Sequence, residues 1–455
     1  MSEHDTITEN EKLHKTLIRV ALPIAAQSLI ASSLSLVDNL MVGKLGETEL
    51  ATVGLSTQIF FIFWMLLFGF TGGTITYMAQ FWGKKDLPNI RKVTGISLTC
   101  CFSVGLLFFL ICLLAPRQVL SIFTNIEDVL TMGERFIRIG SVIFLFWSLV
   151  VPLTALLRAT QQTKIPLQIS AITFAVNTAM GLLLIFGLFG FPRYGFMGAC
   201  YAVLISRVLE FLLYIYVIFI RRNIVAARLK DFFDWDRLLF RRVLNNSIPT
   251  TLNESLWGIG VSMYNAAYGR VGVTEFAAVQ AANTIQNIFS LACFSIGDAM
   301  LILVGEKLGK GEMKEAYRLS KHILLVAVGL GFTAGMIMLS VAKPIAGLFE
   351  FSPDGVYYTI LILIVYSAVL FIKIHNAAQI TGTLRSGGDT RFALIAEISC
   401  VWLIGVPMAF FCVLHLHLPI YLAVLAVQSE EIIKGIILLS RYRSKKWVRN
   451  LVDHL

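Results

Sequence analysis

"ISLTCCFSVGLLFFLICLLA", residues 96–115, contains no charged side chain. A run of about 20 apolar residues is long enough for an α-helix to cross the hydrocarbon core of a bilayer. The stretch "LLVAVGLGFTAGMIMLSVA", residues 324–342, has the same character. A transmembrane β-barrel would instead show segments of about ten residues with alternating polarity. The sequence therefore predicts an all-α polytopic membrane protein.

The composition of the whole chain agrees with this class. Of the 455 residues, 57% are hydrophobic and 15% are charged, whereas a soluble domain carries about 25% charged residues. The first 16 residues lack the basic start and apolar core of a signal peptide, so we expect the first span to be retained. The seven cysteines lie in or beside apolar runs without a C-x-x-C pair, which predicts core packing rather than a metal or disulfide framework.

Twelve membrane-spanning helices are expected from the apolar runs. Their predicted ranges are 17–40, 50–79, 93–115, 133–157, 165–188, 195–220, 244–268, 276–305, 318–342, 355–381, 391–412 and 418–440. These helices divide the chain into a cytoplasmic N-terminal tail (1–16), an N-terminal six-helix lobe (17–220), a cytoplasmic inter-lobe linker (221–243), a C-terminal six-helix lobe (244–440) and a cytoplasmic basic tail (441–455). The linker is expected to contain a surface helix with Phe232, Phe233 and Trp235 at the membrane interface.

The basic residues are distributed unevenly between the two sets of alternate loops. Of 38 Lys and Arg residues, 28 lie at the termini or in the loops on the same side of the membrane as the termini. Seven lie in the loops on the opposite side, and three lie within predicted spans. The positive-inside rule then places both termini in the cytoplasm. The net charge of +10 is therefore a topology signal and a contact for anionic lipids, and we expect no nucleic-acid partner. No loop is long enough for a nucleotide-binding domain, and no phosphate-binding G-x-x-x-x-G-K-[ST] motif occurs, which argues against ATP as a driver.

The chain contains an internal repeat. Residues 37–53, "VDNLMVGKLGETELATV", align with residues 263–279, "MYNAAYGRVGVTEFAAV", and residues 154–164 align with 381–391 at nearly the same offset. Each half holds six predicted spans, an even number, so both halves enter the membrane in the same orientation. Parallel halves of this kind typically flank a central substrate cavity. The architecture alone therefore favours a secondary transporter.

The repeat separates shared structural positions from positions present in one half only. Arg158 and Arg385 occur in both halves and are expected to be cytoplasmic anchors, and Thr48 and Thr274 are expected to cap the helices that follow two glycine turns. Asp38 is different, because the aligned residue is Tyr264 and because it is the only charged residue between Arg19 and Lys44. A carboxylate in one half only is not needed for the shared fold.

Several stretches resemble the multidrug and toxic compound extrusion (MATE) family. They are "ALPIAAQSL", "SLVDNLMVGKLGETELATVG", "AQFWGKKD", "ALLRATQQTK", "GTLRSGGDTRFALIAEI" and the closing "EEIIKGIILLSRYRSKKWVRNL". The resemblance covers residues 15 to 445 and implies a V-shaped fold with a central cavity. It also implies a multidrug efflux antiporter that exports organic cations and other drugs in exchange for H⁺ or Na⁺.

The resemblance assigns candidate coupling residues in the N-terminal half. Asp38 matches the first-helix aspartate that binds the coupling proton or cation in the family, and Asn177 matches an assisting fifth-helix asparagine. Many members carry a second polar residue four positions later, where this chain has Gly181. Asp38 and Asn177 with hydroxyl or carbonyl oxygens would be the place for Na⁺, and no other metal site or cofactor is expected. The structural alternative for Asp38 is a helix-end acid at the membrane interface.

The C-terminal half contributes further candidates, each with a structural alternative. Glu254 is the candidate for a seventh-helix glutamate found in some members, and Asp298 aligns with Gly72, so it too is unique to its half. The tenth predicted helix carries Lys373, His375 and Asn376 where one branch of the family has an aspartate. Lys373 is expected to neutralise Glu254 or Asp298, or to repel cationic drugs.

Two groups of charged residues are interpreted as structural. Arg207 and Glu210 are three residues apart and fall on one helix face, and Glu430, Glu431 and Lys434 lie within one turn of the last predicted helix. These spacings suit intrahelical ion pairs.

Two alternatives to drug export are weighed. A flippase of a lipid-linked oligosaccharide intermediate would need a strongly basic cavity, and a membrane-embedded enzyme would need a catalytic motif such as H-E-x-x-H or G-x-S-x-G, neither of which occurs. The expectation is thus a monomeric, non-enzymatic transporter in the cell (inner) membrane. Its partners would be small-molecule drugs and membrane lipids.

Overall fold

The computed structural model describes residues 3–347, 349 and 351–453. Residues 1–2 and 454–455 of the two expected tails lie outside the described residues. Apolar runs become helices because the backbone of a segment in lipid must satisfy its own hydrogen bonds. The first half contains α1 (Glu3–Gly43), α2 (Glu47–Gly83), α3 (Leu87–Leu114), α4 (Pro116–Ser121), α5 (Glu127–Gly140), α6 (Val142–Ala159), α7 (Lys164–Phe186), the 3₁₀ helix η1 (Leu188–Gly190), α8 (Phe196–Ile215), the π-helix η2 (Tyr216–Ile220) and α9 (Leu229–Phe233). The second half contains α10 (Arg237–Tyr268), α11 (Val273–Gly309), α12 (Met313–Ala346), α13 (Pro353–Ala377), the π-helix η3 (Ala378–Leu384), α14 (Thr390–Cys400), the π-helix η4 (Val401–Gly405), α15 (Val406–Leu414), α16 (Ile420–Val427) and α17 (Ser429–Arg443).

Ten helical stretches of the described chain are long and apolar enough to cross a membrane. They correspond to ten of the twelve predicted spans. The other two are α10, which is too polar along its length, and the pair α16 and α17, which Gln428 separates into two shorter helices. The predicted span 418–440 is therefore broken, and the predicted span 133–157 is also divided, because α5 ends and α6 begins around Ser141.

The two predicted polar segments differ from expectation. Helix α1 already begins at Glu3, so most of the expected tail is helical; once a helix exists, each further residue gains a hydrogen bond without a new nucleation cost. In the linker, α9 has only five residues, and Phe232 is 2% exposed rather than at the membrane interface. Phe232 is buried because Gly95 of α3 lets the linker backbone approach closely.

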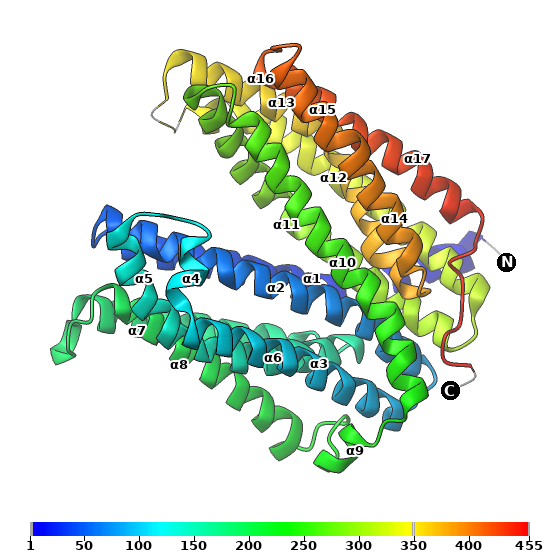
Figure 1. Cartoon of the computed structure of the whole chain (residues 1–455). Helices are drawn as coiled ribbons and strands as arrows, with labels where there is room; N and C mark the ends of the chain where they lie inside the picture. Colours follow the sequence, from blue (N-terminus) through cyan, green and yellow to red (C-terminus); the bar gives the residue numbers. More distant parts are fainter. Residues whose placement is uncertain (1–2, 348, 350, 454–455) are drawn as a thin grey trace. The chain divides into compact units, whose positions relative to one another are not determined.

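The helices form two compact units. The N-terminal unit comprises residues 26–78 and 85–247, and the C-terminal unit comprises residues 1–25, 79–84 and 248–455. Helices α1, α2 and α10 each contribute to both units, so the units do not follow the expected lobe boundaries at residues 17–25 and 79–84. In the N-terminal unit, α3 packs on α6 and α7 on α8; in the C-terminal unit, α11, α12 and α13 pack together (Figure 1).

An aromatic cluster lies in the core of the N-terminal unit. The ring of Phe63 on α2 is 4.8 Å from that of Phe144 on α6 and 5.2 Å from that of Phe108 on α3, measured between centroids. Trp147 of α6 completes the cluster at 5.9 Å from Phe63. Rings at these separations add to the energy of apolar burial, and they belong to the same core cluster as Met41 and Val42 of α1 and Ile185 of α7.

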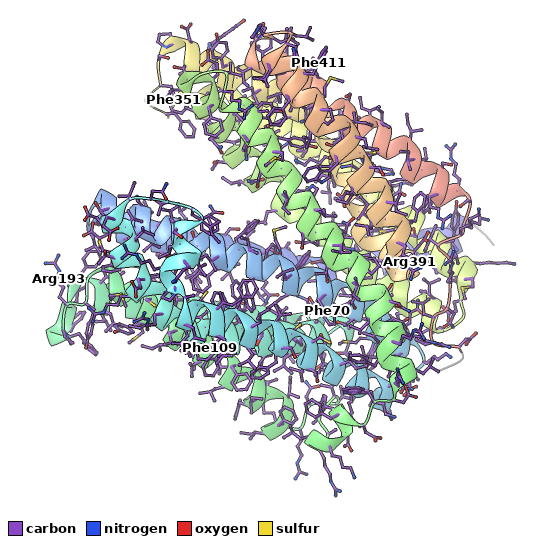
Figure 2. All side chains as sticks on the ribbon, viewed as in Figure 1. Phe70, Phe109, Arg193, Phe351, Arg391 and Phe411 are labelled. Atoms are coloured by element: carbon purple, nitrogen blue, oxygen red, sulfur yellow. The ribbon has the colours of Figure 1, made fainter. Side chains whose placement is uncertain are left out.

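Residues after α17 pack into the C-terminal unit. Trp447 is completely buried and donates from its indole Nε1 to the carbonyl of Tyr442 at 3.3 Å. Gln80 donates from Nε2 to the carbonyls of Ser386 at 2.8 Å and Arg449 at 3.2 Å. In Figure 2, Arg391 and Phe411 lie towards opposite ends of the continuous span formed by α14, η4 and α15.

The glycine turns of the repeat have the same geometry in each half. A Cβ at Gly46 would collide with the carboxylate of Glu49, and a Cβ at Gly272 would collide in the same way with Glu275. Helix α11 starts at Val273 and has no side-chain cap bond, so the expected capping role of Thr274 is wrong. In this turn the carboxylate of Glu275 lies over Gly272, in the space that a Cβ would occupy.

Candidate functional site

Asp38 and Asn177 lie together in the N-terminal unit. The amide Nδ2 of Asn177 on α7 donates to Oδ1 of Asp38 on α1 at 2.8 Å. Asn177 is 1% exposed and Asp38 is half-buried. A carboxylate within a membrane span is costly, at least about 2.5–3.5 kcal/mol at the helix centre on insertion scales, so it needs a polar partner. Asn177, 139 residues away in sequence, is that partner.

Asn177 also has an oxygen that is not used. Its Oδ1 is buried and accepts no hydrogen bond from any of the described residues. An asparagine oxygen with no donor can accept an O–H bond from a protonated carboxylic acid or can ligate a cation. This arrangement can therefore serve a carboxyl group in either of its charge states.

Met41 and Arg207 also lie near the Asp38–Asn177 pair. A Cβ at Gly181 would lie 2.8 Å from Cε of Met41, so the methionine side chain occupies the space of the second polar residue that many family members carry. Arg207 on α8 acts electrostatically on Asp38, but it forms an ion pair with Glu210 at 2.5 Å. Its guanidinium also lies 4.7 Å from the centre of the Trp147 ring. The predicted Arg207–Glu210 pair is thus present.

Glu254 forms an ion pair with an arginine within the C-terminal unit. Arg385 donates from Nη2 to Oε1 of Glu254, and the arginine side chain is only 2% exposed. The aligned Arg158 donates to Oε1 of Gln27 at 2.5 Å in the N-terminal unit. Arg385 is therefore a buried structural cation and not an anchor at the membrane surface. This pairing favours the structural alternative for Glu254.

Helix α17 carries a buried charge network. Lys434, 2% exposed, forms ion pairs with Glu430 at 2.8 Å and with Glu431 at 3.1 Å. Asn376 of α13 donates to Glu431 at 2.8 Å, and Tyr264 of α10 donates to Glu430. The intrahelical pairs agree with the spacing in the sequence, but these residues also join α10, α13 and α17.

Tyr264 is the residue that the repeat aligns with Asp38. Its hydroxyl binds a carboxylate that comes from α17 rather than from its own helix. The C-terminal half thus has an acid at the corresponding position, supplied by Glu430. Gly405 leaves room for this contact, because a Cβ there would collide with both Tyr264 and Glu430.

A cavity of about 90 Å³ lies in the C-terminal unit next to this network. Glu430 and Glu431 contribute to its wall, together with Lys373, Gln286 and several aromatic residues. Lys373 donates to Oε1 of Gln286 at 3.2 Å, instead of pairing with Glu254. Drug-sized pockets typically measure about 300–1,000 Å³, so this cavity is suited to one chemical group of a larger molecule.

The other C-terminal candidates are placed away from the cavity wall. His375 contacts Gln379 at 3.1 Å and Asn376 at 3.4 Å, through its two ring nitrogens. Asp298 is half-buried in α11, where the adjacent Gly297 packs against Thr381 of η3. Neither residue belongs to the described lining of the cavity. Glu397 was not predicted as a site residue, although an acid inside the predicted span 391–412 could have pointed to it. Its carboxylate accepts a hydrogen bond from Asn253 at 2.6 Å.

Comparisons with known proteins agree on one family. The family model described as MatE matches residues 23–183 and, a second time, residues 250–411. The chain is 24% identical over 437 residues to the "Uncharacterized transporter YisQ" of Bacillus subtilis, covering 95% of each chain. It is 23% identical to the "Probable multidrug resistance protein NorM" of Thermotoga maritima, covering 98% of this chain and 95% of that protein. The solved structure titled "Crystal structure of MATE in the straight conformation" has a TM-score of 0.87 at 18% identity and matches 95% of this chain and 97% of the other. The twice-matching model and this structural likeness confirm the predicted duplicated all-α membrane fold.

Proposed function

The chain belongs to the MatE family, and from that premise we propose that it is a secondary active exporter of organic cations and other drugs, driven by exchange for H⁺. The observation that carries this proposal is the Asp38–Asn177 pair at 2.8 Å within two membrane helices. The printed name of the Thermotoga maritima relative, a probable multidrug resistance protein, supports the substrate class.

The donor set around Asp38 favours a proton over Na⁺. Na⁺ is a hard cation that takes several oxygen ligands, whereas a proton needs one carboxylate. Among the described residues, no group of three or more His, Cys, Asp or Glu side chains is placed to hold a metal ion. Asp38 and the unused Oδ1 of Asn177 would need further hydroxyl or carbonyl oxygens to complete a Na⁺ shell, whereas a proton needs none. Na⁺ is the competing coupling ion that the experiment below distinguishes.

Coupling then follows from competition at one carboxylate. Ionised Asp38 accepts the amide N–H of Asn177 and attracts a cationic substrate. Protonated Asp38 has lost that charge, and its O–H can be accepted by the amide oxygen of Asn177 once the amide turns over. A proton and a cation thus weaken each other's binding, as two linked ligands must, and alternating access converts this competition into antiport.

The remaining parts of the proposal concern topology and assembly. The excess of basic residues on one side supports cytoplasmic termini in the inner membrane, and we propose that the protein works as a monomer. The C-terminal cavity does not suit a flippase, which would need a strongly basic site. Its one lining lysine among the described residues, Lys373, lies beside two glutamates.

The test is dye accumulation in everted membrane vesicles in which the proton and sodium gradients are imposed separately. We expect a proton gradient alone to drive transport. Asp38→Asn, which is nearly isosteric but cannot titrate, should reduce transport at least about tenfold, or about 1.4 kcal/mol on the limiting step. The matched control is Asp354→Asn, the same change at an exposed residue in the first turn of α13. Equal transport by wild type and Asp38→Asn would contradict the role of Asp38, and transport driven only by sodium would contradict the choice of ion.

A further inference from the structure

The cavity of the C-terminal unit is distinct from the Asp38 site, and its polar groups are not balanced. Its wall combines two carboxylates, one ammonium group and several amides with aromatic rings. Whether such a wall selects a cation or an anion depends on which of these groups still have free hydrogen-bonding capacity.

The acceptor oxygens of the wall are already engaged. Lys434 binds one oxygen of Glu430 and one oxygen of Glu431. The second oxygen of Glu430 accepts from Tyr264, and the second oxygen of Glu431 accepts from Asn376. Every carboxylate oxygen of Glu430 and Glu431 therefore already accepts from one protein donor.

The amide oxygens of the wall are engaged as well. Oε1 of Gln286 accepts from Lys373 at 3.2 Å, and Oδ1 of Asn283 accepts from Tyr366 at 2.8 Å. In contrast, the amide N–H groups of Gln286 and Asn283 donate no hydrogen bond to the described residues. Lys373 has three N–H donors, and the described chain supplies an acceptor for one of them.

We propose that this cavity binds the carboxylate of an aromatic substrate, held by Lys373 with the amide groups of Gln286 and Asn283. The carboxylate supplies the acceptors that these donors lack, and bonds between ionised partners are roughly twice as strong as neutral ones. Lys434 and Lys373 together balance the negative charges of Glu430 and Glu431, and each oxygen of these two carboxylates already accepts from a protein donor. The rings of Trp257 and Tyr366, which also line the cavity, can pack against the aromatic body of the substrate.

The proposal rests on the proposed function, because the carboxylate belongs to an exported compound. The transporter would thus accept amphipathic molecules that carry a carboxylate as well as a cation. In this arrangement Lys373 acts as a specificity determinant, in place of the expected neutralisation of Glu254 or Asp298.

The test uses rhodamine 19, which has a free carboxylate, and its ethyl ester rhodamine 6G, which has the same ring system without that charge. Binding to the purified full chain in detergent is measured by fluorescence anisotropy without any ion gradient. Lys373→Met should weaken rhodamine 19 binding at least about tenfold. The same change should leave rhodamine 6G binding unchanged or tighter, because the glutamates lose a nearby positive charge. Lys343→Met, at an exposed lysine of α12, is the matched control and should change neither affinity.

Equal weakening of both dyes would show that Lys373 is only structural and would overturn the proposal. A second measurement needs no variant: benzoate should displace rhodamine 19 from the wild-type protein, and the neutral isostere benzamide should not. Equal displacement by the two compounds would also overturn it. Binding and transport are separable here, because carboxylate-selective binding without gradient-driven export would support this site while contradicting the proposed function.

Discussion

The Glu254–Arg385 ion pair allows a quantitative prediction from burial. The Arg385 side chain is 2% exposed and that of Glu254 is 16% exposed. Removing one partner of a buried pair typically costs about 3–5 kcal/mol, because the other charge is left without compensation. We therefore expect Arg385→Met to lower the free energy of unfolding by about this amount.

The repeat provides the matched comparison. Arg158 is half-buried, less deeply than Arg385, and donates to the neutral side chain of Gln27. Loss of a hydrogen bond to one charged group costs about 1.5–3 kcal/mol, so Arg158→Met should be milder than Arg385→Met. Adding Glu254→Gln to Arg385→Met should restore stability, because the double variant no longer contains an isolated buried carboxylate.

The assay is thermal unfolding in detergent, followed by tryptophan fluorescence at one fixed scan rate because such unfolding is often irreversible. A loss of 1 kcal/mol lowers Tm by about 2–4 °C in domains of 150–250 residues. Arg385→Met should therefore lower the apparent Tm by at least about 6 °C. If Arg385→Met is no less stable than Arg158→Met and Glu254→Gln restores nothing, Arg385 does not compensate a buried charge on Glu254.

Three further predictions concern helix packing, the C-terminal residues and a loop ion pair. A Cβ at Gly309 would collide with the backbone of Gln80 near the end of α2, so Gly309→Ala should lower the free energy of unfolding by about 1–3 kcal/mol. Gly329 of α12 faces open space, so Gly329→Ala should be neutral or stabilising. Thermal unfolding of the two variants compares these effects. Trp447→Ala should cost about 3–5 kcal/mol because its ring is completely buried, and a loss below about 1 kcal/mol would show that the last residues are dispensable for stability. The hydrogen bond from Lys307 at 2.5 Å lowers the pKa of Glu312 from its usual 4.5, so its small stabilisation is present above pH 4.5 and is lost as the pH falls further. Because this pair is exposed, Glu312→Gln should cost less than about 1 kcal/mol at pH 7 and nothing in acid, measured as Tm against pH.

Hydropathy and the internal repeat predict most of the fold, because membrane spans and duplication are encoded locally along the chain. They do not predict the break at Gln428, since the apolar run continues through residues 418–427 and the charged residues that follow look like an ordinary helix end. Hydropathy also fails to predict where a helix continues into polar sequence, because α1 begins at Glu3, ahead of the predicted span 17–40.

The candidate site is predictable only in part for a related reason. Asp38 stands out as an isolated charge, and the family resemblance supplied Asn177, which the structure places in hydrogen-bonding contact with it. Tyr264 and Glu430 are 166 residues apart, and their contact depends on the rotation of two helices about their axes. Hydropathy carries no information on that rotation, so the donor-rich cavity beside them is visible only in three dimensions.

The proposed antiport depends on Asp38 binding a proton in competition with a cationic substrate. The most direct measurement is the affinity of a cationic dye between pH 5 and pH 8, with and without sodium, in wild type and in Asp38→Asn. For the wild type, affinity should rise with pH, by up to about tenfold per pH unit where Asp38 titrates, and should not respond to sodium. For Asp38→Asn, the dye should bind with an affinity independent of both ions. An identical pH response in the two proteins would contradict the claim and would leave Asp38 as a helix-end acid.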